Sequence, residues 1–554
     1  MSRKKKENSS HPFNRRDFLR YTAMGSAMAF APSVLTEVAE AASLPASSSS
    51  ISRFELEELT VAELQAGMES GKWTARSVAE KYLSQIEKID KHGPEVNSVI
   101  ELNPDAPAIA EALDKERKAG RARGPLHGIP LLIKDNIDTA DRMTTTAGSL
   151  ALAGSIAPRD SFIVQRLRAA GAVILGKTNL SEWANIRSSH STSGWSARGG
   201  QTRNPYVLDR NPCGSSSGSA VAVAANLAAL AIGTETDGSV VCPSSANSLV
   251  GIKPTLGLVS RSGIIPIAHS QDTAGPMART VTDAAILLGA IAGIDPADAI
   301  TNESRGHSAA DYTQFLDRNG LRGARIGVAR QSFGFNEKVD RLINSRLEEM
   351  KRLGAVIVDP AEIATAGKFD GSELEVLLYE LKADLNKYLA ALGPRAPVRS
   401  LKEVIEFNER NKEKEMPYFG QDLFIKAEAK GPLTSRDYLK ALAKNRRMSR
   451  TEGIDAVMIK NKLDAMVAPT GGPPWPTDLL NGDHFTGGFS SPAAVAGYPH
   501  ITVPAGYIHG LPVGISFFGR AWAEPRLIKL AYAFEQATHA RRPPQFLPHV
   551  DLSE

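Results

Sequence analysis

The residues best suited to chemistry lie in two Gly/Ser-rich loops that together span Cys213 to Cys242. The first loop reads Cys-Gly-Ser-Ser-Ser-Gly-Ser and the second Gly-Thr-Glu-Thr-Asp-Gly-Ser-Val-Val-Cys, with a run of small apolar residues, 220–232, between them. Gly and Ser supply unusual dihedrals and capping oxygens, whereas alanine favours a helix, so the first loop should open a helix. A packed helix between two such loops favours a functional loop pair over a flexible linker.

Lys134 ends a short apolar run, residues 128–134, that we interpret as a buried strand. Burial disfavours the charged ammonium, so a buried lysine is partly neutral and can act as a base. The alternative is a lysine whose ammonium extends to water at the edge of the strand. Spacing alone favours this alternative, because long lysine side chains reach water routinely.

The first loop also matches the nucleophile elbow of serine hydrolases, with Ser216 between Gly214 and Gly218. In that interpretation the residues around His127 would form the oxyanion segment. An elbow requires an apolar strand directly before it, whereas residues 203–213 are polar and contain two prolines. Histidines at positions 269, 484, 500 and 509 could act as the base, but none has a distinctive setting. This hypothesis therefore ranks low.

Helical and strand-like patterns alternate through most of the chain. Residues from about 303 to 455 are rich in Lys, Glu and Leu at helical spacing, which indicates a mostly helical segment. The alternation predicts an α/β fold: one large domain with a central mixed β-sheet covered by helices on both faces. Helices are predicted over 54–92, 106–119, 162–170, 283–291 and 525–537, and strands over 128–134, 171–179, 465–468, 500–504 and 513–518.

The composition excludes several classes of protein. The formal net charge is +4, but the 58 basic and 57 acidic residues after position 41 nearly cancel, which argues against a nucleic-acid-binding surface. Two cysteines among 554 residues exclude a disulfide framework. No uncharged segment is long enough to anchor the chain stably in a membrane, and no His/Cys/Asp spacing indicates a metal site.

Residues 1–41 resemble a twin-arginine export signal. Arg15 and Arg16 precede Phe18 and Leu19, a weakly apolar run follows, and Ala-Glu-Ala at 39–41 offers a cleavage site. The alternative is a short amphipathic or disordered tail. We expect the twin-arginine export machinery as a partner, a periplasmic or extracellular location, and a flexible Ser-rich leader at 42–54.

Four motifs together resemble the amidase signature family. They are Gly-Ile-Pro-Leu-Leu-Ile-Lys-Asp at 128–135, Ala-Gly-Ala-Val-Ile-Leu-Gly-Lys-Thr-Asn at 170–179, Gly-Ser-Ser-Ser-Gly-Ser-Ala at 214–220 and Gly-Thr-Glu-Thr-Asp-Gly-Ser at 233–239. The resemblance implies one amidase domain over residues 55–545, with the helical segment 303–455 inside it. Asp237 and the sequence that begins at Leu377 favour the branch of this family that acts on peptide amides.

The family's Ser–cis-Ser–Lys triad falls on three residues of this chain. By the resemblance, Ser239 is the nucleophile, and Ser215 relays its proton to neutral Lys134 and returns it to the departing amine. The backbone N–H groups of one loop would bind the developing oxyanion. That loop consists of Thr236, Asp237, Gly238 and Ser239. No metal or other cofactor is implied.

Several residues depart from the family pattern or add to it. Many members have glycine where this chain has Ser217 and Asp237. The Asp237 side chain could orient Ser239, repel anionic substrates, or only cap the loop. Cys213 and Cys242 bracket the two loops, and we expect buried free thiols there, because cargo of the twin-arginine pathway folds before export.

The resemblance implies a serine-dependent amidase that hydrolyses carboxamides through an acyl-enzyme, with C-terminal amides of peptides as substrates and ammonia as product. A general aliphatic or aryl amidase, or an esterase, of the same family is the alternative. An exported binding protein with an inactive amidase fold agrees less well with intact Lys134, Ser215 and Ser239. A subunit of a tRNA-linked amidotransferase shares the fold, but an export signal would separate it from cytosolic tRNA.

We expect cleavage close to Ala41 during export, because Ala-Glu-Ala follows the paired arginines and the apolar run. N-terminal sequencing of the protein secreted by its native host tests this expectation. A secreted chain that retains Arg15 and Arg16 would contradict it.

Overall fold

The computed structural model describes residues 54–394 and 396–552. The predicted export signal, residues 1–41, and the predicted leader up to residue 53 lie outside the described residues. Within the described part, no helix combines the length and the apolar character that crossing a membrane requires.

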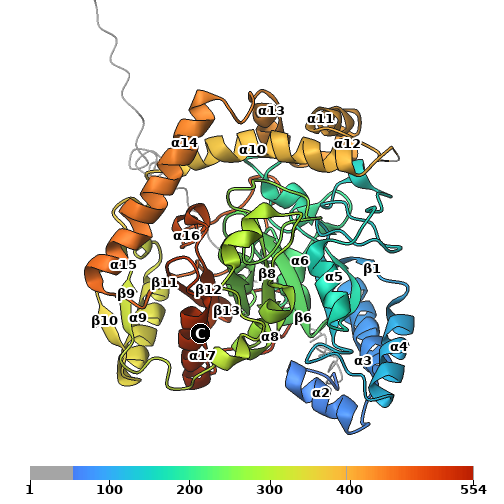
Figure 1. The fold of residues 1–554 in the computed structure, drawn as a ribbon, viewed down its shortest axis with the longest axis horizontal. Helices are drawn as coiled ribbons and strands as arrows, with labels where there is room; N and C mark the ends of the chain where they lie inside the picture. The colour runs from blue at the N-terminus through green and yellow to red at the C-terminus, as the bar shows by residue number, and fades with distance from the viewer. Residues whose placement is uncertain (1–53, 395, 553–554) are drawn as a thin grey trace, which may run out of the picture. The chain divides into compact units, whose positions relative to one another are not determined.

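One mixed sheet of eleven strands forms the centre of the described chain, as the sequence predicts (Figure 1). From one edge to the other the strands are β1 (Val99–Leu102), β3 (Val173–Thr178), β2 (Pro130–Lys134), β6 (Leu230–Glu235), β8 (Thr273–Ala278), β7 (Val250–Lys253), β12 (His500–Ile508), β13 (Leu511–Phe518), β11 (Ala465–Pro469), β9 (Arg325–Val328) and β10 (Val356–Val358). Two parallel groups, β3–β2–β6 and β11–β9–β10, flank a run of antiparallel strands. The short strands β4 (Trp195–Ser196) and β5 (Gly200–Gln201) pair separately.

Helices cover both faces of this sheet, which confirms the predicted fold class. The helices outside the segment 303–455 are α2 (Val61–Glu69), α3 (Ala75–Gln85), α4 (Ala106–Lys118), α5 (Phe162–Ala169), α6 (Ser217–Ala224), α7 (Val241–Ala246), α8 (Val281–Ile291), α15 (Asp455–Asn461), α16 (Ser491–Ala496) and α17 (Glu524–Thr538). α3 and α4 pack on β3, α6 packs on β2 and β6, and α17 packs on β12. These contacts place the N-terminus of α6, where the first Gly/Ser loop ends, over the parallel strands β2 and β6.

The apolar run 220–232 forms two elements instead of the single predicted helix. α6 ends at Ala224, and β6 begins at Leu230. Asn226 between them has a φ of 57°, a left-handed conformation that asparagine tolerates. Because every residue from 220 to 232 is buried, no polar periodicity marks the change from helix to strand.

The segment 303–455 is mainly helical. Its first helix, α9 (Glu337–Arg352), lies beside β10 and β11, and the helices that follow gather along one side of the molecule (Figure 1). These are α10 (Asp370–Ala391), α11 (Leu401–Arg410), α12 (Lys412–Glu415), α13 (Asp422–Glu428) and α14 (Arg436–Arg446). The segment also supplies β9 and β10, which the sequence analysis did not predict. These strands are four and three residues long, too short for a periodic signal, and β9 pairs with β11 from much later in the chain.

Cys213 and Cys242 form a disulfide, so the expectation of free thiols is wrong. Their Cα atoms lie 6.0 Å apart, a distance that a disulfide spans without rearrangement of the backbone. Folding before export brings the two sulfurs together, and oxidation can follow folding. The bond ties the loop that contains Ser215 to the first turn of α7, three residues after Ser239.

Removal of this disulfide should lower the stability of the folded chain. The bond closes a loop with a sequence separation of 29, for which loop-closure entropy gives about 3–4 kcal/mol. We expect the double variant Cys213→Ser, Cys242→Ser to unfold at a lower Tm than the oxidised chain in differential scanning calorimetry. Equal Tm values would show that the bond adds nothing to stability.

Candidate active site

The predicted site loops meet at the carboxyl ends of the neighbouring strands β2 and β6. β2 and β6 are parallel neighbours, so Lys134 at the end of β2 lies beside Thr234 near the end of β6. The loop of Ser215 leads into α6, which packs against both strands. The loop of Ser239 continues directly from β6 into α7. Residues from three separate motifs therefore converge at one place.

Lys134 is fully buried, and its amine contacts the predicted relay serine. Nζ lies 2.8 Å from Ser215 Oγ, 2.9 Å from Thr234 Oγ1 and 3.3 Å from Thr234 O. The lysine that extends to water, which spacing alone favoured, is therefore the wrong interpretation. The physical reason is the position of β2 between β3 and β6, which leaves its last side chain no open edge.

Burial lowers the pKa of Lys134 to about 7, because removal from water disfavours the ammonium. The negative charges of Glu235 and Asp272 act in the opposite direction. At neutral pH a large fraction of this amine is therefore uncharged, and its lone pair can accept a proton.

Ser215 is buried in a loop that depends on glycine. The Gly214–Ser215 peptide bond is cis. A Cβ atom on residue 214 would lie 2.2 Å from Ser181 Oγ, so a larger residue does not fit. Ser181 N donates to Ser215 O at 3.1 Å and holds the loop in place, while the Ser215 hydroxyl faces Lys134.

The other two serines of this loop are bound to backbone groups. Ser216 Oγ, which the elbow pattern would select, donates to Thr234 O at 3.0 Å and accepts from Thr234 N at 3.1 Å. Ser217 Oγ donates to Cys213 O at 2.6 Å. Among these three serines, Ser215 is thus the one whose hydroxyl contacts an ionisable base.

The loop 236–239 carries backbone donors that have no acceptor. The N–H groups of Asp237, Gly238 and Ser239 make no hydrogen bond within the described chain. Gly238 has a φ of +76°, a left-handed conformation that favours glycine and turns successive N–H groups to one side. Ser239 is 8% exposed, and its hydroxyl makes no hydrogen bond to Ser215 in this structure, although Ser216 N donates to Ser239 O at 3.2 Å.

Two residues that the sequence left without a predicted role, Glu235 and Asn136, support this arrangement. Glu235 Oε2 accepts hydrogen bonds from Val240 N at 2.8 Å and Val241 N at 3.0 Å, so its carboxyl caps the start of α7. Asn136 Nδ2 donates to Thr234 Oγ1 at 3.0 Å, beside the lysine amine. In the sequence, both residues could have been found by their position, because each is a polar residue at or just after the end of an apolar strand.

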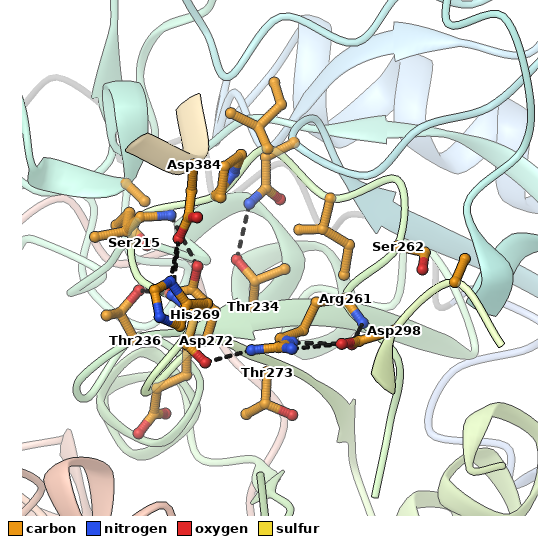
Figure 2. Close-up of a pocket in the computed structure, with 18 residues that line it drawn as sticks. Ser215, Thr234, Thr236, Arg261, Ser262, His269, Asp272, Thr273, Asp298 and Asp384 are labelled. Atoms are coloured by element: carbon orange, nitrogen blue, oxygen red, sulfur yellow. Dashed lines mark hydrogen bonds and ion pairs between the residues drawn. The ribbon is translucent and has the colours of Figure 1, made fainter. Parts of the chain in front are cut away.

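A cavity of about 170 Å³ opens beside Ser215 (Figure 2). Figure 2 shows Arg261 paired with Asp298 on one side of it and His269 bonded to Asp384 on the other. The cavity joins one apolar wall to polar and charged side chains, which suits an organic substrate that also carries polar groups. The apolar wall consists of Ile264, Ile265, Pro266 and Ile267.

His269, Glu380 and Asp384 lie close enough to share a cation. Each already has protein partners: His269 Nδ1 lies 2.7 Å from Asp384 Oδ2, and Tyr438 Oη donates to Glu380 at 2.7 Å. Burial alone would lower the pKa of His269, but the hydrogen bond to Asp384 and the charge of Glu380 raise it above its usual value. We therefore describe the group as an ion-pair cluster and assign it no metal.

Comparison with known proteins agrees with the geometry. The sequence model of the family described as Amidase matches residues 78–528. A probable amidase from Arabidopsis thaliana is 44% identical over 506 residues, which cover 90% of this chain and 93% of that protein.

Solved structures give the same result. Native peptide amidase from Stenotrophomonas maltophilia is 54% identical, with a TM-score of 0.85 over 89% of this chain and 100% of that chain. Peptide amidase in complex with the competitive inhibitor chymostatin is also 54% identical, with a TM-score of 0.87 over the same shares of the two chains. The chain therefore belongs to the amidase signature family and is an amidase hydrolase.

Proposed function

We propose that this amidase hydrolyses the C-terminal amides of peptides and releases ammonia through an acyl-enzyme on Ser239. The observation that carries the proposal is the 2.8 Å contact between Lys134 Nζ and Ser215 Oγ in a buried site. The cavity beside Ser215 supports an organic amide as substrate. The similarity to a peptide amidase that binds the competitive inhibitor chymostatin supports a peptide amide in particular.

In the first step the uncharged Lys134 amine accepts the Ser215 proton while Ser215 Oγ accepts the proton of Ser239. Ser239 Oγ forms a bond to the amide carbon, and the carbonyl oxygen becomes negative. The N–H groups of residues 236–239 donate to that oxygen. The step requires the Ser239 hydroxyl to turn toward Ser215 when the substrate is bound.

In the second step the proton on Lys134 returns through Ser215 to the amide nitrogen, the C–N bond breaks and ammonia leaves. Water then attacks the ester on Ser239 through the same relay, Ser239 regains its proton, and the carboxylic acid leaves. Because an amine without a proton is a poor leaving group, amide cleavage depends on the relay more than ester cleavage does.

We also propose that residues 1–41 are a twin-arginine signal, which directs the enzyme to the periplasm or the exterior of the cell. The disulfide between Cys213 and Cys242 supports this location, because disulfides persist in oxidising compartments. The expected partners are therefore the export machinery and a small or peptide amide.

Ser239→Ala should abolish both covalent labelling by a fluorophosphonate and ammonia release from a peptide amide, because Ser239 carries the acyl group. Ser215→Ala should lower amide turnover by about 10²–10⁴-fold and ester turnover by less, because an amine leaving group depends on the returned proton more strongly than an alcohol does. Peptide mapping of the labelled chain identifies the serine that reacted.

Ser216→Ala is the matched control on the same loop, since the Ser216 hydroxyl bonds only to the Thr234 backbone. This variant should keep the label on Ser239. A label on Ser216 would contradict the mechanism and favour a histidine-based hydrolase. A panel of peptide amides, aryl amides and esters tests the substrate class, and a preference for aryl amides or esters would overturn the peptide-amide assignment.

The value of kcat/KM should rise with pH through about 7, because the protonated form of Lys134 cannot accept a proton. Below that pKa the loss should approach about tenfold per pH unit, and just above it the rate should reach a plateau, unless another group ionises at higher pH. Lys134→Ala should lower turnover by about 10²–10⁴-fold. Steady-state measurements of ammonia release over this pH range test both statements.

Lys177 provides the control for this experiment, because it is equally buried on the neighbouring parallel strand β3. Its Nζ donates to Ile137 O at 2.7 Å and Thr145 Oγ1 at 2.9 Å and contacts no site serine. Lys177→Ala should lower thermal stability but preserve the turnover of each folded molecule. Equal losses of turnover in the two variants would contradict the role of Lys134.

A further inference from the structure

The Asp237 side chain lies in the proposed oxyanion loop, where its two oxygens differ. Oδ2 accepts a hydrogen bond from Ser491 Oγ at 2.5 Å, at the N-terminus of α16. Oδ1 is buried, and no N–H group or hydroxyl of the described residues donates to it. A buried carboxylate oxygen without a donor is costly, and a protonated acid beside it would supply one.

Glu373, in the first turn of α10, is an acid in the right place. It is 8% exposed, and its carboxyl lies within hydrogen-bonding range of the Asp237 carboxyl. Two carboxyl groups can form a hydrogen bond only if one of them holds a proton. Glu373 and Asp237 are therefore a pair that shares one proton.

Gln271 identifies the oxygen of Glu373 that holds the proton. The Gln271 Nε2 atom lies 3.2 Å from Thr236 O and 2.9 Å from Glu373 Oε1. A carbonyl oxygen only accepts, so the side-chain atom that contacts Thr236 must be the amide nitrogen. Glu373 Oε1 is then an acceptor as well, which leaves Oε2 as the oxygen that can hold a proton toward Asp237.

The surroundings of Glu373 favour the neutral form of its carboxyl. Burial raises the pKa of Glu373 well above its usual range, the charge of Asp237 raises it further, and the hydrogen bond from Gln271 acts in the opposite direction. Asp370 on the same helix adds to the rise, and α14 contributes the uncharged Asn445, which donates to the backbone of this first turn. The charged groups that face Asp237 from the sheet are Glu235 on β6 and Lys253 on β7.

We propose that Glu373 is a positioning residue that holds the oxyanion loop through the proton it shares with Asp237, and that loss of this proton sets an upper pH limit for turnover. The inference rests on the proposed function, because it takes the N–H groups of this loop as the donors to the oxyanion. Gln271 and Ser491 anchor the same loop, through Thr236 and Asp237. Without the shared proton, two adjacent carboxylates repel each other and add a negative charge beside the developing oxyanion.

Glu373→Gln tests the proposal, because the amide keeps a donor toward Asp237 and does not titrate. In the wild type, kcat/KM for a peptide amide should rise with pH as Lys134 loses its proton and fall again at higher pH. In Glu373→Gln the rising limb should remain, and the falling limb should disappear or move upward by about one pH unit or more. Glu373→Ala removes the donor and should lower the plateau by on the order of ten- to hundred-fold.

Glu375→Gln is the matched control, since it makes the same chemical change on the same helix, in an ion pair with Lys430 away from the oxyanion loop. This variant should keep the wild-type pH profile. The Glu373→Gln profile keeps the test valid if Glu373→Ala does not fold, because glutamine has nearly the shape of glutamic acid.

Fluorophosphonate labelling of Ser239 in the same samples separates this inference from the proposed function. A label on Ser239 together with an unchanged falling limb in Glu373→Gln overturns the role of Glu373 and leaves the proposed function intact. A wild-type profile without a falling limb would also overturn the role of Glu373 and leave the proposed function intact. Full plateau activity in folded Glu373→Ala would do the same. Absence of the label from Ser239 in the wild type overturns the proposed function and this inference with it.

Discussion

The arrangement of the site depends on the desolvation of one lysine amine. β2 lies between two parallel strands, so Lys134 at its end cannot reach water, and burial brings its pKa to about 7. The partners of its amine are uncharged: the Ser215 hydroxyl and the hydroxyl and carbonyl of Thr234. A carboxylate in direct contact would favour the ammonium and leave no base at neutral pH, so the neutrality of these partners matters as much as the burial.

The rest of the fold fixes two loops relative to that amine. The loop of Ser215 is held by Ser181 and enters α6, and the disulfide joins it to the first turn of α7. Glu235 holds the second loop by capping the same helix start. These constraints act on the positions of the backbone. Because the proposed oxyanion donors are backbone N–H groups, which cannot turn as side chains can, the backbone of this loop must already be in place. The proposed nucleophile Ser239 is held through its backbone, and its hydroxyl makes no hydrogen bond to Ser215 in this structure.

The sequence predicted the elements that carry their own signal. Lys134, Ser215 and Ser239 stand in long motifs, and the structure brings their loops together at the carboxyl ends of β2 and β6. Features that depend on distant partners could not be predicted: β9 and β10 need β11 to form a ladder, and the Glu373–Gln271 contact joins residues 102 positions apart. The burial of the lysine belongs to this second group, because only the strand order shows that β2 has neighbours on both sides.

Asp237 connects the proposed oxyanion loop to parts of the chain that carry none of the family motifs. A glycine at this position would need no partner, whereas a carboxylate in a partly buried loop requires donors for both oxygens. α16 supplies Ser491 for one oxygen, and α10 places Glu373, the proposed proton donor, beside the pair. In a chain with glycine at position 237, Glu373 would be a buried acid without an acceptor beside it. Asp237 and Glu373 each account for the presence of the other. The aspartate in the loop and the helix α10 beside it therefore form one structural unit.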